Sequence, residues 1–227
     1  MGDMLAANSF DLADVIAYRR LESKSNRALL VAISGIDASG KGSLAWRLST
    51  NLKRLGMNVA TIGIDPWQTS PALRQEAADP AEHFYLHGYR FEDLFEWVVE
   101  PLRRDRALDL EVELLDPHAG RRYTTRLSYE AIDVIVLEGI FLFKRELRDR
   151  YDVSVWVECG FPAALRRAIV RNQEGLPKGR LVSDYERIYF PAQRLHFDAD
   201  RPREFADFHF PNQLQRPPER ILISRFL

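Results

Sequence analysis

The sequence contains a single cysteine, Cys159, so no disulfide can form within the chain. Such a chain is typical of a reducing compartment. No apolar run approaches the roughly 20 residues that a membrane-spanning helix needs. The first residues include Asp3, Asp11 and Asp14 and lack the basic-then-apolar order of a signal peptide. We therefore expect a cytoplasmic protein that binds no membrane.

Excess charge of either sign is also missing, because 32 Lys and Arg residues face 33 Asp and Glu residues. This balance argues against nucleic-acid binding by bulk charge. No His and Cys spacing suggests a zinc site, and no Gly-x-Ser-x-Gly motif suggests a hydrolase. These absences favour a protein that acts on small molecules, and they leave a homo-oligomer open.

Apolar segments of strand and helix type alternate along the chain, which predicts an α/β fold with a mostly parallel sheet between two helical layers. We expect one domain over residues 1–227, with an N-terminal helical extension at 1–27 and a hairpin insertion at 106–128. The expected strands are 28–34, 58–64, 109–115, 121–127, 133–138, 152–158 and 221–224. The expected helices are 9–22, 41–55, 91–104, 162–173 and 183–196. The segment 66–89 is irregular and suggests a functional loop.

The stretch from Gly35 to Ser43 reads Gly-x-x-x-x-Gly-Lys-Gly-Ser between a predicted strand and a predicted helix. This is the context of a nucleotide phosphate-binding loop, or P-loop. Its backbone N–H groups and the helix N-terminus attract an anion, and Lys41 adds a full charge. The predicted nucleotide contacts are Gly35, Asp37, Ala38, Ser39, Gly40, Lys41, Gly42 and Ser43.

Gly42 stands where a Ser or Thr hydroxyl usually binds Mg²⁺, and Ser43 follows one residue late. We expect Ser43 to serve the metal directly or through water. Glu138 ends an apolar strand and is a second candidate for the metal site. The alternative for Glu138 is a charge at a strand end that faces solvent.

Asp65 follows the second predicted strand, at the sheet edge where ligands bind in open parallel sheets. Its carboxylate is suited to orient an alcohol for attack on a γ-phosphate and to take the proton. The alternative is a polar residue that opens an Asp-Pro turn. Because a phosphate loop accompanies it, we favour the functional interpretation.

Basic and aromatic side chains form two further candidate groups. Arg167 and Arg171 share a helix face and precede a Gly- and Pro-containing segment, so residues 166–183 are predicted to form a lid over ATP. Arg166 is better explained as a solvated residue. His83, Tyr85 and Arg90 belong to an aromatic cluster that either contacts the substrate or packs under a long loop.

Several motifs together resemble the phosphoribulokinase/uridine kinase family of P-loop kinases, and in particular bacterial uridine-kinase-like proteins. The matching segments are 33–41, 64–67, 114–118, 136–142, 165–171 and 189–193, with Ala206, Asp207 and Asn212 near the end. The resemblance implies phosphorylation of a small-molecule hydroxyl by ATP and Mg²⁺. It implies that Asp65 is the base and that Arg167 and Arg171 serve the lid. It also suggests Asp79, Asp116 and His118 as substrate contacts.

The sequence departs from the family pattern at three places: Gly42 in the loop, Leu115 before the hairpin Asp, and the lid sequence at 171–180. These departures bear on which acceptor is bound more than on phosphoryl transfer itself. The leading hypothesis is a kinase of uridine or cytidine. The alternatives are a kinase of another small alcohol, such as pantothenate, a sugar or a sugar phosphate, and an ATP-binding regulatory protein without turnover.

Overall fold

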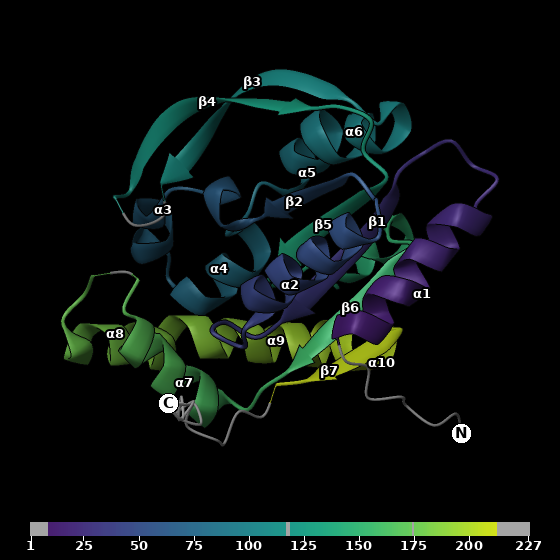
Figure 1. Ribbon diagram of the computed structural model, residues 1–227. Coiled ribbons are helices and arrows are strands. Elements are labelled where there is room, and N and C mark those ends of the chain that lie inside the picture. Colours follow the sequence, from purple (N-terminus) through teal and green to yellow (C-terminus); the bar gives the residue numbers. More distant parts are fainter. Residues whose placement is uncertain (1–8, 117–118, 174, 213–227) are drawn as a thin grey trace, which may run out of the picture.

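A five-stranded sheet forms the centre of the protein in a computed structural model that describes residues 9–116, 119–173 and 175–212 (Figure 1). Its strand order is β2-β5-β1-β6-β7 and every neighbouring pair is parallel. The strands are β1 (Leu29–Gly35), β2 (Val59–Gly63), β5 (Val134–Gly139), β6 (Val153–Glu158) and β7 (Phe208–Pro211). The predicted parallel sheet is confirmed.

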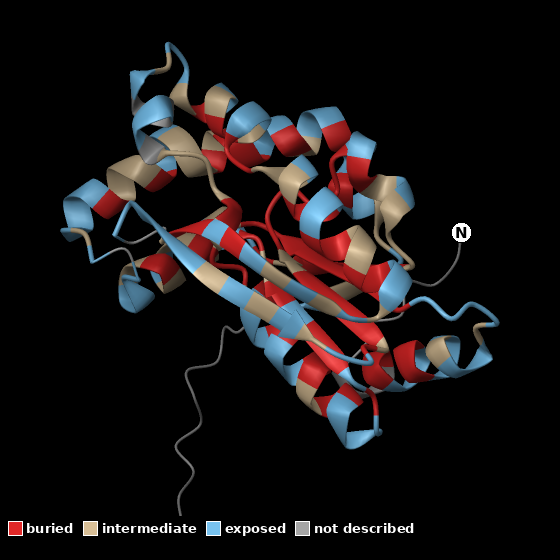
Figure 2. Ribbon diagram, turned by 90° about the horizontal axis from the view of Figure 1, so that it is seen from above, coloured by how far each residue is buried: buried red, intermediate tan, exposed pale blue. Residues whose placement is uncertain are grey.

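Helices α1 (Ser9–Glu22) and α2 (Lys41–Arg54) cover one face of this sheet. Their apolar stripes pack against alternate strand residues such as Val31 and Val155, which point to the same side. The intervening residues, such as Leu30 and Leu137, belong to a separate core on the opposite face. Figure 2 shows the central strands buried along most of their length. The predicted three-layer α/β/α fold is therefore confirmed.

Helical segments from two parts of the chain build the layer on this opposite face. The first part contains α3 (Pro71–Glu76), α4 (Pro80–His87), α5 (Phe91–Leu94), a π-helical turn (Phe95–Val99) and α6 (Glu100–Asp105). The second contains α7 (Phe161–Arg171), α8 (Lys178–Asp184), a π-helical turn (Tyr185–Tyr189), α9 (Phe190–Asp200) and α10 (Pro202–Phe205). Short 3₁₀ helices occur at Asp65–Trp67 and Arg145–Arg150. None of the described helices is long and apolar enough to cross a membrane.

The expected hairpin is present as β3 (Leu108–Asp116) and β4 (Arg121–Tyr129). It forms its own antiparallel sheet, in which Asp116 pairs with Arg121 beside the turn. In Figure 1 it arches over α5 and α6 and ends near α3. It therefore borders the region that follows β2.

Three parts of the predicted secondary structure are wrong by more than a residue or two at the end of an element. Segment 66–89 contains α3 and α4, because its prolines occupy the first helical turn, where a missing N–H costs nothing. The helix predicted at 183–196 runs from 178 to 200 through a π-helical turn. Strand β7 was not predicted, and the predicted strand at 221–224 lies outside the described residues.

Candidate active site

The loop between β1 and α2 has the backbone shape that the motif predicts. Gly40 has φ of 95° and Ala38 has φ of 53°, both in the left-handed region. At this φ a side chain on residue 40 would be strained, and a Cβ atom there would also press against the side-chain amide of Asn212. No side chain caps the N-terminus of α2, which leaves its N–H groups available to an anion.

A pocket of about 760 Å³ opens over this loop. It contains most of the predicted loop contacts together with Asp65, Glu138, Arg167 and Arg171. Gly35 and Ser39 are buried instead and do not line it. Among the described residues, its lining consists of Asp37, Ala38, Gly40, Lys41, Gly42, Ser43, Trp46, Arg47, Asp65, Glu138, Arg167, Arg171, Gln173 and Asn212.

The strand order gives this pocket two sides. Strand β1, which leads into the loop, has β5 and β2 on one side and β6 and β7 on the other. Glu138 and Asp65 come from β5 and from the end of β2, so they lie on the first side. Arg167 follows β6 and Asn212 follows β7, so they lie on the second side.

Lys41 begins α2 and is 9% exposed. Within the described part of the chain, no hydrogen bond or ion pair holds its ammonium group. A buried cation without a partner is costly. A phosphate group in the pocket would supply the missing negative charge.

Asp65 starts the 3₁₀ turn after β2, and the Tyr89 hydroxyl donates to its Oδ1 at 3.4 Å. The residue is exposed and lines the pocket. Desolvation raises the pKa of Asp65 above its usual value, while the charge of Lys41 opposes this shift. The carboxyl group is therefore a better proton acceptor than an ordinary surface aspartate.

Glu138 lies beside the loop glycine and beside β2. A Cβ atom on Gly42 would be 3.8 Å from its Oε1, and one on Gly63 would be 3.0 Å from the same atom. Burial raises the pKa of Glu138 to about 7, with the charge of Asp65 adding to the rise and that of Lys41 opposing it. Nothing in the described part of the chain donates a hydrogen bond to this carboxylate or pairs with it. It is thus suited to receive a cation.

The donor set fits Mg²⁺ better than a metal that needs a cage of protein ligands. Among the described residues, no three His, Cys, Asp or Glu side chains are grouped around one point. Mg²⁺ commonly takes one or two carboxylates together with waters and substrate phosphates. Glu138, with the exposed Ser43 hydroxyl in the same pocket, matches that pattern.

Arg167 occupies a different position from that expected of a lid residue. Its Nη1 donates to the Ser39 carbonyl oxygen at 3.0 Å, and its Nη2 donates to the Asn212 carbonyl oxygen at 2.6 Å. Nη1 also lies 3.4 Å from Sγ of the buried Cys159. The Asn212 amide donates to the same Ser39 oxygen at 2.5 Å. The guanidinium therefore ties the phosphate loop to the end of β7.

Arg171, one turn further along α7, is exposed and lines the pocket. In the described ranges no hydrogen bond or ion pair restrains its side chain. Its charge lowers the pKa of both Asp65 and Glu138, although burial is the larger effect on each. Of the two predicted lid arginines, Arg171 is the one whose guanidinium is available to a ligand.

The predicted substrate residues that the structure describes do not line this pocket. Asp79 caps α4 by accepting hydrogen bonds from the N–H groups of Ala81 and Glu82. The Tyr85 hydroxyl donates to Asp200 at 2.6 Å, and the His83 ring packs against that of His87.

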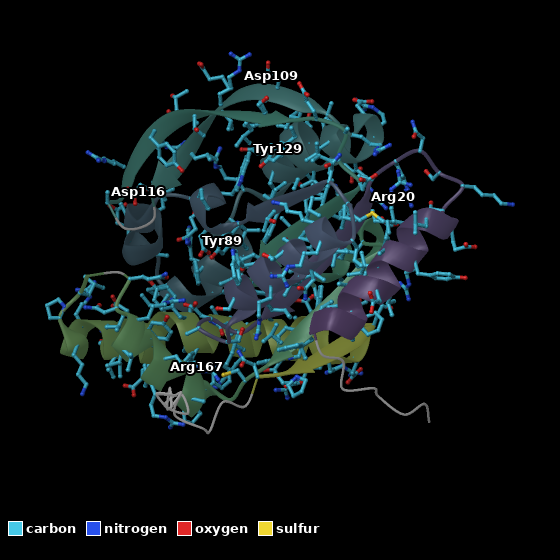
Figure 3. The ribbon with its side chains drawn as sticks, in the orientation of Figure 1. Arg20, Tyr89, Asp109, Asp116, Tyr129 and Arg167 are labelled. Carbon is cyan, nitrogen blue, oxygen red and sulfur yellow. The ribbon has the colours of Figure 1, made fainter. Side chains whose placement is uncertain are left out.

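Arg90 and Asp116 are likewise bound to other parts of the protein. Arg90 pairs with Asp93 and donates to the Glu113 carbonyl oxygen of the hairpin. Asp116 accepts from the N–H of Ala119 in the hairpin turn. Figure 3 shows it at the end of the hairpin, well away from Arg167. His118 lies outside the described residues.

Five residues of the site were not among the predicted contacts: Trp46, Arg47, Gln173, Gln193 and Asn212. Gln193 is buried and accepts a hydrogen bond from the Asp37 N–H at 3.0 Å, which braces the loop. Of these residues, Trp46 could have been identified from the sequence, because a tryptophan on the polar face of an amphipathic helix is unusual.

Comparison with known proteins places these features in context. No family model matches the sequence. A uridine kinase of Macrococcus caseolyticus is 28% identical over 191 residues, which cover 82% of this chain and 89% of that protein.

Two solved structures share the fold. A possible uridine kinase from Bacillus stearothermophilus has a TM-score of 0.67 and 24% identity, and the match covers 88% of this chain and 97% of that one. A proposed fructose transport system kinase from Silicibacter sp. TM1040 has a TM-score of 0.72 and 21% identity, covering 90% and 100%.

The fold is therefore the one that these two structures share. In sequence, the chain is similar to curated uridine kinases at 26–28% identity over 80–84% of its length.

Proposed function

We propose that this protein is a kinase that uses ATP and Mg²⁺ to phosphorylate a hydroxyl group of a small molecule. The observation that supports the proposal best is the meeting of Lys41, Asp65 and Glu138 in one pocket. Asp65 follows β2, Glu138 lies near the end of β5, and Lys41 follows the loop after β1. These three strands are neighbours in the sheet, in the order β2-β5-β1. A phosphate-binding loop with two carboxylates on one side is what phosphoryl transfer to an alcohol requires.

In this proposal the loop N–H groups and Lys41 hold the phosphates of ATP. Asp65 orients the acceptor hydroxyl and takes its proton as the oxygen attacks the γ-phosphorus. The new oxygen–phosphorus bond forms as the bond to the β,γ-bridging oxygen breaks, and ADP leaves. Arg171 stabilises negative charge on the transferred group.

Glu138 and Ser43 would hold Mg²⁺, which neutralises phosphate charge when bound. Gly42 supplies no hydroxyl, so Ser43, one residue later, would supply it. Arg167 acts as a positioning residue, because its guanidinium holds the loop carbonyl of Ser39.

The leading acceptor is a nucleoside such as uridine or cytidine, since relatives named uridine kinase support this class. The alternative is another small alcohol, such as pantothenate, a sugar or a sugar phosphate. The neighbour named as a fructose transport system kinase supports keeping sugars in the test.

The test is a coupled assay of ADP release with MgATP and a panel of nucleosides, sugars, sugar phosphates and vitamins. One acceptor should raise the rate at least tenfold above the acceptor-free rate. Asp65→Asn should lower kcat by about 10²- to 10⁴-fold, the usual contribution of a general base, with little change in ATP affinity.

Asp198→Asn is the matched control, because Asp198 is an exposed residue of α9 outside the pocket. It should keep full activity. ATP binding with no stimulation by any acceptor would contradict the kinase proposal and favour an ATP-binding regulatory protein.

A further inference from the structure

Trp46 is an exposed tryptophan inside the nucleotide pocket. Its residue surface is 68% exposed, although tryptophan usually buries most of its large apolar area. It lies on α2, one turn past the phosphate loop, and lines the same cavity as Lys41 and Ser43. An aromatic face left open in a pocket is a surface that a flat ligand can cover.

The position of Trp46 on α2 identifies the part of the ligand that it would meet. The loop N–H groups lie at the N-terminus of α2, and Ser43 and Trp46 are three residues apart on one helix face. A molecule whose phosphates occupy the loop and that extends past Ser43 along this face reaches Trp46 next.

Helix geometry places Trp46 over the phosphate-binding end of the pocket. Trp46 lies one turn after Gly42 and shares its helix face, and a Cβ atom on Gly42 would lie 3.8 Å from Oε1 of Glu138. The next residue, Arg47, points toward β7 instead, with its guanidinium carbon 5.6 Å from the centre of the Phe210 ring. Asp65, the proposed base for the acceptor, follows β2, one strand beyond the strand of Glu138.

We propose that Trp46 is the platform on which the base of the bound nucleotide stacks. The inference rests on the proposed function, because it assumes that a nucleoside triphosphate occupies the loop. Stacking on an aromatic face tolerates any base and is stronger for larger ring systems. The site should therefore bind purine nucleoside triphosphates more tightly than pyrimidine ones.

The test compares two ligands that share phosphates and differ in the base. Calorimetry measures the Kd of the β,γ-imido analogue of ATP and that of inorganic tripolyphosphate for the wild type, Trp46→Ala and Trp46→Phe. Trp46→Ala should weaken analogue binding roughly 5- to 100-fold, the range expected for one stacked base. Trp46→Phe should restore most of the affinity, and tripolyphosphate should bind all three within about twofold.

Fluorescence provides an independent readout. Binding of the analogue should quench tryptophan emission in the wild type and in Trp97→Phe, because Trp97 is 43% exposed and lies outside the pocket. The quench should be lost in Trp46→Phe.

Two results separate the failure of this inference from that of the proposed function. Unchanged analogue binding in Trp46→Ala, or equal weakening of both ligands, would overturn the stacking role alone. No binding of the analogue or of tripolyphosphate by the wild type would overturn both.

Discussion

Replacement of Arg167 by alanine tests whether this residue positions the phosphate loop or acts in the lid. The guanidinium donates to the carbonyl oxygens of Ser39 and Asn212 and also contacts Cys159. Alanine removes both hydrogen bonds at once. The Ser39 oxygen then keeps only the Asn212 amide, and the Asn212 oxygen loses its donor.

The magnitude follows from these two bonds. A hydrogen bond that involves a charged group contributes about 1.5–3 kcal/mol. Arg167 is only half-buried, so the lower end of the range applies to each bond. We therefore expect Arg167→Ala to lower the free energy of unfolding by about 3 kcal/mol. For a chain of this size, that corresponds to a fall in Tm of about 6–12 °C.

Urea denaturation followed by circular dichroism measures the change, and calorimetry with tripolyphosphate reports on the loop. Arg167→Ala should weaken tripolyphosphate binding as well as stability. The stability and tripolyphosphate affinity of Arg167→Lys should lie between those of the wild type and of Arg167→Ala, because one ammonium group cannot match the two-pronged geometry of a guanidinium. Arg166→Ala is the matched control, since Arg166 is exposed on the same helix. Unchanged stability together with a large loss of kcat in Arg167→Ala would refute the positioning role.

Two further predictions concern the metal site and acid stability. Gly42→Thr should lower the Mg²⁺ concentration needed for half-maximal activity, because the new side chain starts 3.8 Å from Oε1 of Glu138. Gly42→Val controls for the shape of the side chain. An unchanged Mg²⁺ requirement in Gly42→Thr would contradict a metal site beside Glu138. Burial lowers the pKa of His196, so the folded protein holds it neutral while the unfolded chain protonates it below about pH 6.5. Stability should fall with pH below that point by at most about 1.4 kcal/mol per pH unit for this one group, and urea titrations of His196→Asn should lack this part of the slope.

Asp200 adds a further loss of folding stability, at lower pH than the loss caused by His196. Burial alone would raise its pKa, but hydrogen bonds from His196 and Tyr85 outweigh it, and the pKa of Asp200 is lowered. Its stabilising effect is present above the unfolded pKa of about 4 and is lost in stronger acid. Both groups therefore make the protein less stable as the pH falls.

Local patterns predicted the elements that build the phosphate loop. The helix at 9–22 has the predicted bounds, and β1 and α2 agree with prediction to within one residue at each end. In these segments, apolar periodicity and the Gly-Lys motif agree with the burial of one stripe or of a whole strand. Where such signals coincide, the sequence alone is a sufficient guide.

The rest of the fold depends on contacts between distant residues. Strand β7 has only four residues, and its place is set by pairing with β6 more than 50 residues earlier. The role of Arg167 likewise depends on Ser39, 128 residues away, and on Asn212. Helix spacing predicted that Arg167 and Arg171 share a helix face, but it cannot show whether a guanidinium finds carbonyl oxygens or a ligand.

Hydrogen bonds connect the segments around Asp65, on the side of the pocket where we propose that the acceptor binds. The Arg90 N–H donates to the Trp67 carbonyl oxygen, and the Thr69 N–H donates to that of Gly88, so the turn after Asp65 is joined to the end of α4. Tyr89 adds the hydrogen bond to the Asp65 carboxylate. Residues 65–69 and 88–90 are therefore joined by hydrogen bonds, and we expect a substitution that shifts residues 88–90 to reposition the proposed base without touching the phosphate loop. Changes of acceptor within this fold should thus arise in the α3–α4 segment, while the loop and its Arg167 contacts stay the same.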